Sequence, residues 1–370
     1  MKVPFLDLKL AYEELSDQLE PAVLRALRSG WYIGGQEVEA FESVYAKYCG
    51  ASQAVAVANG LEALELALRA CDIGPGDEVI VPSNTFIATW LAVSRTGATI
   101  VPVEPDEYTY CIEAIAVSKA ITERTKAIIP VHLYGQPVDI DPIVALAEPS
   151  GIFVIEDAAQ AHGARYRGRR IGGTRHATAW SFYPAKNLGA LGDAGAVTTD
   201  SAEIADRLRM LRNYGSKEKY VNEIAGFNSR MDPVQAAVLA LKVGVLDVWN
   251  SRRQSIANRY IEAFRATPLV LPVVPEWADP VWHLFVVRHP QRDWLADELS
   301  KRGVQTQAHY PIPPHEQQAY AHLGYASEAF PLAGLLAREV LSLPIGPQMS
   351  TAEVDWVIES VLDVLGRPNE

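Results

Sequence analysis

Residues 152–160 read Ile-Phe-Val-Ile-Glu-Asp-Ala-Ala-Gln, an apolar run that ends in two carboxylates followed by small residues. A short apolar run of this kind predicts a strand that is buried on both faces, as in a parallel sheet. In open α/β sheets ligands bind beyond the carboxyl ends of the strands, so Asp157 is expected to face a cleft. A lone acid at a strand end is more often a helix cap, and the rest of the chain decides between these readings.

Similar runs recur along the chain and define the fold class. Strands are predicted at 54–58, 78–81, 99–103, 125–130, 177–181 and 194–198, and apolar residues recur at helical spacing in 16–30, 36–50 and 61–71. Strands alternating with helices predict an α/β fold, a mostly parallel central sheet flanked by helices. A long helix is predicted after Asp232, with Asp232 as its cap and Pro233 in its first turn, running through Leu246.

The pattern of predicted strands and helices changes beyond about residue 250, which predicts a second domain. Helices are expected at 252–266, 292–302 and from 351 onward, with a strand at 283–288. A chain of 370 residues is also longer than one core usually serves. We therefore expect a large domain over 1–248 and a smaller C-terminal α+β domain over 249–370.

Composition excludes several classes of function. The formal charge of −12 argues against nucleic acid, whose backbone is bound by clustered Lys and Arg. No stretch is long enough to span a membrane, and the start lacks an export signal, so a cytoplasmic location is expected. Cys49, Cys71 and Cys111 are too far apart for a metal knuckle and suit a reducing compartment as buried small hydrophobes. No metal site is predicted.

A second stretch decides the reading of Asp157. Residues 181–189 read Ser-Phe-Tyr-Pro-Ala-Lys-Asn-Leu-Gly, which places Lys186 among small and apolar neighbours 29 residues after Asp157. Such a lysine is desolvated, which favours its neutral amine and makes it a nucleophile toward an aldehyde. An exposed surface lysine is the weaker reading here.

These residues match the needs of pyridoxal phosphate. This cofactor needs a lysine for its aldehyde, a carboxylate for its ring nitrogen, a stacking surface and donors for its phosphate. Gly60 and Leu61 open a helix after a strand, where backbone N–H groups and the helix dipole favour a phosphate, and Ser181 adds a hydroxyl. Phe86 follows another strand and is a candidate for stacking on the ring, although it reads equally well as a core aromatic.

Together these elements resemble fold-type I aminotransferases, and more narrowly the DegT/DnrJ/EryC1/StrS family of sugar aminotransferases. The resemblance runs from Pro4 nearly to the C-terminus. Its most distinctive stretches are Gly30-Trp-Tyr-Ile-Gly-Gly-Gln-Glu-Val38, Val131-His-Leu-Tyr-Gly135, Glu156-Asp-Ala-Ala-Gln-Ala-His-Gly163, the Lys186 segment and Gly226-Phe-Asn-Ser-Arg-Met-Asp232.

The resemblance implies a role for each matching residue. Lys186 would be the Schiff-base lysine and Asp157 the partner of the pyridine nitrogen. Gln160 would lie near the ring hydroxyl. Phe86 would stack on the ring, Gly60, Leu61 and Ser181 would hold the phosphate, and Asn228 would reach the phosphate from the partner subunit of a homodimer. The commoner family pattern has Gly-Thr at Gly60-Leu61, so backbone donors must carry more of the phosphate here.

The resemblance also implies the reaction. An amino donor, by resemblance L-glutamate, would displace Lys186, which then acts as acid and base and leaves the cofactor as pyridoxamine phosphate. A nucleotide-linked keto sugar would next take up the amino group, and the sequence looks most like members that aminate C3 of a dTDP-linked 3-keto-6-deoxyhexose to a 3-amino-3,6-dideoxy sugar.

Substrate contacts are expected from three places, which are the Lys186 segment, the loop 307–317 and residues 219–230. The proline-rich loop 307–317 would hold His309 and Tyr310 as donors to the sugar or the pyrophosphate. A plain surface loop is the alternative reading for this segment. Further candidates for the sugar and the nucleotide diphosphate are Tyr183, Lys219, Tyr220 and Arg230.

Other readings remain open at this point. One is amination at C4 of the sugar, and another is an aminotransferase for a keto-cyclitol. A sugar dehydratase of this fold would carry histidine in place of Lys186, and a cofactor-binding regulator would be expected to carry a basic DNA-binding module.

Overall fold

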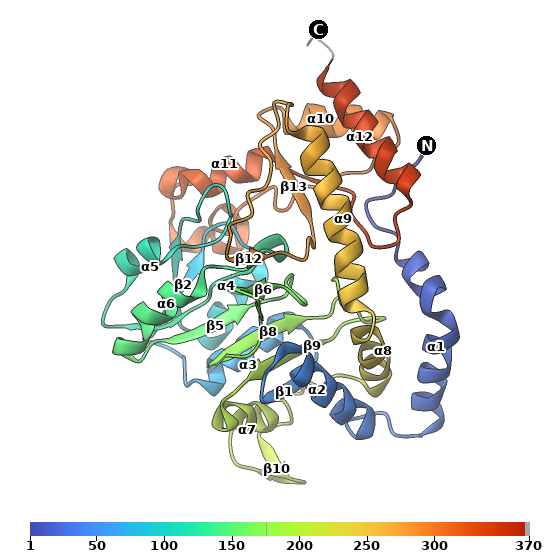
Figure 1. The fold of residues 1–370 in the computed structure, drawn as a ribbon. Coiled ribbons are helices and arrows are strands. Elements are labelled where there is room, and N and C mark those ends of the chain that lie inside the picture. The colour runs from blue at the N-terminus through green and yellow to red at the C-terminus, as the bar shows by residue number, and fades with distance from the viewer. Residues whose placement is uncertain (175, 367–370) are drawn as a thin grey trace.

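A seven-stranded mixed sheet forms the centre of the computed structural model, which describes residues 1–174 and 176–366 (Figure 1). The strand order is β1-β9-β8-β5-β4-β2-β3; β9 runs antiparallel to both of its neighbours and the other pairs are parallel. The predicted mostly parallel sheet is therefore confirmed. Its strands are β1 (Gln53–Val57), β2 (Glu78–Pro82), β3 (Thr99–Val103), β4 (Thr125–Ile128), β5 (Phe153–Asp157), β8 (Ala177–Ser181) and β9 (Gly195–Thr199).

Helices cover both faces of this sheet, because successive side chains of each buried strand point to opposite sides. Val55 and Val57 pack on one face with helices α3, α4 and α7, whereas Ala56 packs on the other with α2 and α8. Helices α5 and α6 cover the rest of that second face. The bounds are α1 (Leu8–Arg28), α2 (Gln36–Cys49), α3 (Gly60–Ala70), α4 (Ile87–Thr96), α5 (Ala114–Ala120), α6 (Ile140–Ala147), α7 (Ala202–Leu211) and α8 (Pro233–Val243).

Two of the helix predictions need correction. The helix expected after Asp232 ends at Val243, and a new helix, α9 (Leu246–Phe264), begins three residues later, well before the predicted start at 252. Pro233 occupies the first turn as predicted, but the Asp232 side chain makes no capping hydrogen bond. Helix α1 begins at Leu8 and not at 16, with the Asp7 side chain accepting the Lys9 N–H.

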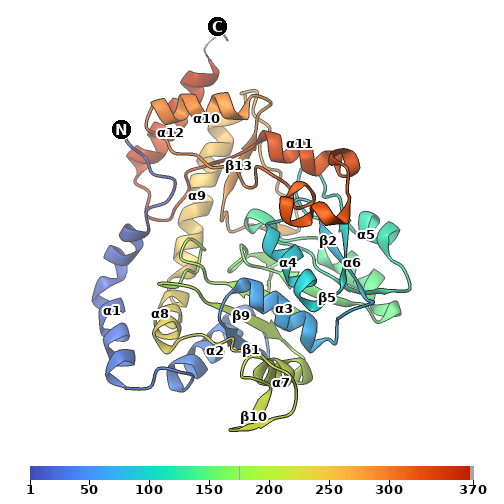
Figure 2. The same cartoon turned by 180° about the vertical axis from the view of Figure 1, so that it is seen from behind.

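The C-terminal helices lie together at one end of the molecule (Figure 2). They pack around their own apolar cluster. The C-terminal part contains α10 (Arg292–Lys301), α11 (Pro331–Glu339), α12 (Thr351–Leu365) and the antiparallel pair β13 (Phe285–Arg288) and β14 (Val340–Leu343). Val3 belongs to this cluster and bridges Val304, so the N-terminus lies beside the C-terminal helices. The boundary proposed near residue 248 falls in the first turn of α9 and stays a prediction.

Short elements complete the described chain. Two small sheets are formed by β12 (Ala278–Asp279), β6 (Arg165–Tyr166) and β7 (Arg169–Arg170), and by the hairpin β10 (Ser216–Glu218) and β11 (Val221–Asn222). Short 3-10 helices lie at Leu133–Gly135, Glu148–Ser150, Pro314–Glu316, Gln318–Leu323 and Ser327–Ala329. Within the described residues, no helix has both the length and the apolar character needed to cross a membrane.

Candidate active site

Lys186 lies in the connection between β8 and β9, at the carboxyl end of β8. The connection folds back on itself, because the Lys186 N–H donates to the Tyr183 carbonyl (2.8 Å) and the Ala190 N–H to the Phe182 carbonyl (2.8 Å). Burial lowers the pKa of the Lys186 amine to about 8, and the nearby Asp157 carboxylate opposes part of that shift. The amine is therefore much more available in its neutral form than an ordinary lysine.

Asp157 is the last residue of β5, the strand next to β8 in the sheet. The carboxylate is buried and accepts hydrogen bonds from the Thr89 hydroxyl (2.9 Å) and the Ala159 N–H (3.2 Å). Burial raises its pKa, and the two hydrogen bonds and Lys186 oppose that rise. A buried carboxylate of this kind is stabilised by a cation beside it, such as a protonated ring nitrogen.

A cradle for an anion lies at the start of α3, against the end of β8. The Asn59 side chain caps the helix by accepting the Glu62 N–H (2.9 Å). Gly60 and Leu61 open the helix, so their N–H groups have no partners inside it. A Cβ atom at Gly60 would lie only 2.5 Å from the Ser181 Cβ and 3.1 Å from its hydroxyl oxygen. Only glycine at this position brings the helix N-terminus and the Ser181 hydroxyl so close together.

Aromatic and amide groups gather near the same strand ends. Phe86 precedes α4, is 51% exposed, and its ring centroid lies 5.1 Å from that of Tyr310. The Gln160 amide oxygen accepts the Tyr134 N–H (2.6 Å), and its nitrogen donates to the Tyr310 hydroxyl (2.9 Å). The segment after β5 and the loop expected to bind substrate are thus joined through Gln160.

His309 also belongs to this group. Its Nδ1 lies 2.8 Å from the Ser342 hydroxyl, and its carbonyl accepts a hydrogen bond from the Tyr134 hydroxyl. Burial, followed by the nearby Lys186, lowers the pKa of the imidazole to about 4, so the ring is neutral at physiological pH. The loop 307–317 is therefore more than a surface loop at this end.

Several predicted contacts are not brought to Lys186 within one chain. Lys219 and Tyr220 form the turn of the β10–β11 hairpin, which projects at the end of the molecule opposite the C-terminal helices (Figures 1 and 2), and Tyr220 is 87% exposed. Asn228 is exposed, and Arg230 donates to the Asn213 side chain (3.2 Å) and lines a separate surface pocket of about 670 Å³. Tyr183, by contrast, belongs to the Lys186 connection itself, and it is 55% exposed there.

The structure also adds residues that the sequence reasoning missed. Thr89 reaches Asp157 from α4, and no sequence signal marked it. His132 and Tyr134 lie in the motif Val131–Gly135, whose sequence alone indicates no role for either side chain. The three cysteines are free and buried, as expected. Across the described residues, no group of three or more His, Cys, Asp or Glu side chains is placed to hold a metal ion.

The arrangement fits pyridoxal phosphate. The glycine cradle, a lysine with a depressed pKa and a buried carboxylate all meet at the carboxyl ends of β5 and β8, where α/β sheets bind ligands. Lys186 can hold the aldehyde, Asp157 can face the ring nitrogen, and the N-terminus of α3 can hold the phosphate. Fold and site together define a fold-type I pyridoxal-phosphate-dependent aminotransferase.

Comparisons with known proteins agree with this class. Residues 13–362 match the DegT/DnrJ/EryC1/StrS aminotransferase family, and the chain belongs to that family. It is 54% identical over 361 residues to dTDP-3-amino-3,4,6-trideoxy-alpha-D-glucose transaminase of Streptomyces venezuelae, covering 97% of this chain and 95% of that one. It is 51% identical to dTDP-3-amino-3,6-dideoxy-alpha-D-galactopyranose transaminase of Aneurinibacillus thermoaerophilus, covering 97% and 98%.

A solved structure gives the same result for the fold. The crystal structure of S. venezuelae DesV in complex with a ketimine intermediate superposes with a TM-score of 0.98, at 52% identity and complete coverage of both chains. The predicted family, fold type, cofactor and aminotransferase activity are therefore confirmed.

Proposed function

We propose that this aminotransferase moves an amino group from L-glutamate to C3 of a dTDP-linked 3-keto-6-deoxyhexose, giving a 3-amino-3,6-dideoxy sugar. The observation that carries the proposal is the full-length similarity to two transaminases named for dTDP-3-amino sugars, joined to a buried lysine of lowered pKa and a close approach of Gly60 to Ser181. Glutamate as the donor rests on the family resemblance.

The side chains supply distinct parts of the reaction. When bound, pyridoxal phosphate supplies the aldehyde that takes up the amino group and the ring that draws electrons from the reacting carbon. Lys186 is proposed to hold that aldehyde in the resting enzyme. Once displaced by the donor, its amine is proposed to carry the proton between the donor carbon and the cofactor. A pKa of about 8 suits this work, because the amine can both accept and return a proton near neutral pH.

The remaining cofactor contacts are proposed to orient the ring. Asp157 would keep the ring nitrogen protonated, and Gln160 would lie at the ring hydroxyl with Phe86 stacked on the ring. Gly60, Leu61 and Ser181 would hold the phosphate. The close approach of α3 to Ser181 and the burial of Asp157 support these assignments.

A homodimer is proposed to complete the site. The side chains available to a second copy are Lys219, Tyr220 and Asn228, which are exposed, and Arg230, which is half-buried. An apolar surface at the end of α1 supports this, because Trp31, Tyr32 and Ile33 are each at least half exposed. We keep the cytoplasm as the proposed location, since three buried free thiols suit a reducing compartment.

Two experiments test the function. The enzyme should be incubated with glutamate and either the 3-keto or the 4-keto dTDP-6-deoxyhexose, and the product sugars identified. Amination of the 3-keto sugar alone is expected, and amination of the 4-keto sugar alone would overturn the assignment of C3. For the dimer, mixing Lys186→Ala and Asn228→Ala chains should regain part of the activity that each lacks. No recovery in mixed dimers would contradict a site shared between subunits.

A further inference from the structure

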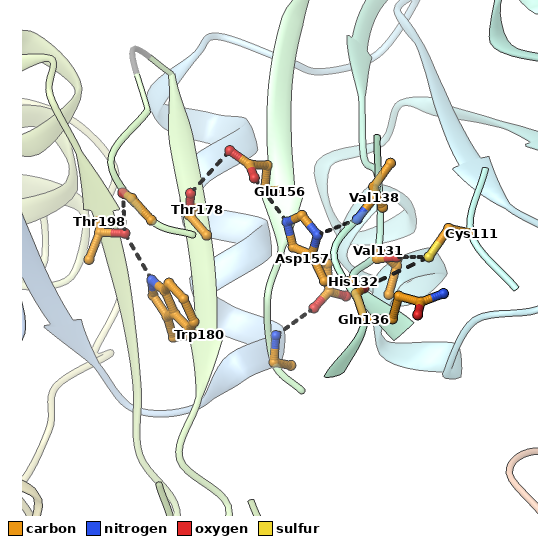
Figure 3. Close-up of polar contacts among 12 residues, drawn as sticks. Cys111, Val131, His132, Gln136, Val138, Glu156, Asp157, Thr178, Trp180 and Thr198 are labelled. Atoms are coloured by element: carbon orange, nitrogen blue, oxygen red, sulfur yellow. Dashed lines mark hydrogen bonds and ion pairs between the residues drawn. The ribbon is translucent and has the colours of Figure 1, made fainter. Parts of the chain in front are cut away.

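His132 is a buried histidine outside the cofactor contacts described so far, and both of its ring nitrogens are engaged. It has no exposed surface. The Val138 N–H donates to Nδ1 (3.0 Å), so Nδ1 carries no proton and the ring proton sits on Nε2. Nε2 lies 2.9 Å from the Glu156 carboxylate and donates to it (Figure 3). The ring therefore bridges β5 and the far end of the segment that follows β4.

The backbone of His132 is fixed as well. Its N–H donates to the Asp157 carbonyl (3.0 Å), and the Asp157 N–H donates to the Pro130 carbonyl (2.9 Å). Glu156 and Asp157 are consecutive on β5, so their side chains point to opposite faces of the strand. His132 thus binds the last two residues of β5 at once, one through its ring and one through its backbone.

The segment that His132 fastens, residues 131–138, holds the Gln160 amide. The Tyr134 N–H donates to the Gln160 amide oxygen (2.6 Å), which leaves the amide nitrogen to donate to Tyr310. Tyr134 has a φ of +60°, a left-handed conformation that persists in a residue other than glycine only where the surroundings hold it. The orientation of the Gln160 amide therefore depends on how firmly this segment is held.

We propose that His132 is a positioning residue of the cofactor site: it locks residues 131–138 against the end of β5 and thereby fixes the Gln160 amide beside the cofactor ring. His132 itself touches neither cofactor nor substrate. Loss of either ring hydrogen bond leaves a buried polar group without its partner, Glu156 in one case and the Val138 N–H in the other. The segment can then relax, and the Gln160 amide loses its fixed orientation.

The test is a double-mutant cycle on the affinity of the apoenzyme for pyridoxal phosphate. His132→Asn keeps an acceptor for Val138 and loses the donor to Glu156, and His132→Gln does the reverse. Each should weaken cofactor affinity about tenfold, the usual effect of one unsatisfied buried group. Because His132 acts through Gln160, the two effects should not add. A double variant that also carries Gln160→Ala should bind the cofactor no more than about twofold more weakly than whichever single variant binds it less tightly.

A control variant separates the hydrogen bond that Glu156 accepts from the charge that it carries. Glu156→Gln keeps an oxygen to accept the His132 proton and an amide to face Thr178, so its affinity should stay within about twofold of the wild type. The proposal would be overturned if the fold-losses of cofactor affinity in the His132 and Gln160 single variants multiplied in the double variant. It would also be overturned if both His132 variants kept wild-type cofactor affinity and showed only a lower melting temperature. A Glu156→Gln loss as large as that of His132→Asn would also overturn it. The readout is cofactor binding, so the outcome does not depend on which sugar or donor the enzyme uses.

Discussion

Substituting Gly60 by alanine should damage the phosphate site by pushing α3 away from β8. The new Cβ would lie 2.5 Å from the Ser181 Cβ, whereas carbon atoms in contact sit about 3.5–4.0 Å apart. The first turn of α3 must therefore move by about 1 Å, enough to break hydrogen bonds from its N–H groups to a phosphate. Overpacking of this kind lowers stability by about 1–3 kcal/mol. A hydrogen bond to a charged group is worth about 1.5–3 kcal/mol, so losing one from the phosphate corresponds to about a 10- to 150-fold loss of affinity.

The assay is titration of the apoenzyme with pyridoxal phosphate, followed by absorbance, together with a thermal melt. Gly74→Ala is the matched control, because a Cβ there meets nothing closer than the Thr96 carbonyl at 3.8 Å. Adding Ser181→Gly to Gly60→Ala removes the 2.5 Å contact and leaves only a tight one of 3.1 Å to the Cα of residue 181, so it should restore part of the lost melting temperature while the missing hydroxyl keeps the affinity low. Wild-type cofactor affinity in Gly60→Ala would refute the reasoning.

Three further predictions follow from the electrostatics and the exposed groups of the site. The rate at which the apoenzyme captures pyridoxal phosphate should rise with pH and level off above about 8, because the neutral Lys186 amine is the nucleophile; an inflection near 10.5 would contradict the effect of burial. Thr89→Val removes a hydrogen bond that lowers the pKa of Asp157, so the carboxylate should take up a proton at a higher pH than in the wild type. Cofactor binding should then be lost at a higher pH on acidification, and an unchanged pH profile would show that this bond has no such effect. Tyr183→Phe and His309→Ala should slow turnover with the keto sugar while leaving the glutamate half-reaction nearly intact, as measured by single-turnover absorbance, and equal loss in both halves would count against a substrate role.

The strands were predictable because their signal is local. Each buried strand is a short run of β-branched and apolar residues, and β3 (Thr99–Val103) and β8 (Ala177–Ser181) begin and end where the sequence pattern placed them. The start of α1 was missed although Leu8 and Tyr12 recur at helical spacing. These two side chains are 47% and 42% exposed, so the first turns of α1 lack the buried face that the strands share. Likewise, α8 ends at Val243 with Gly244 as its C-cap, although apolar residues continue on both sides of this glycine.

The site was predictable as far as single residues carry chemistry. Lys186 was identified because a lysine among small apolar residues is unusual in itself, and Asp157 was identified only in combination with that lysine. Thr89 and His132 were not identified, since their roles arise from hydrogen bonds between segments that are distant in the sequence. The role proposed for the hairpin residue Lys219 shows another limit, because a contact across a subunit interface would be a property of the assembly and not of one chain.

The central claim is that the Lys186 amine forms the covalent link to pyridoxal phosphate. Treating the holoenzyme with borohydride and mapping the peptides by mass spectrometry tests it most directly. We expect the reduced cofactor on Lys186 alone, and we expect Lys186→Ala to carry no label and to lack the reducible absorbance band. A label on any other lysine, or an unchanged band in Lys186→Ala, would contradict the account.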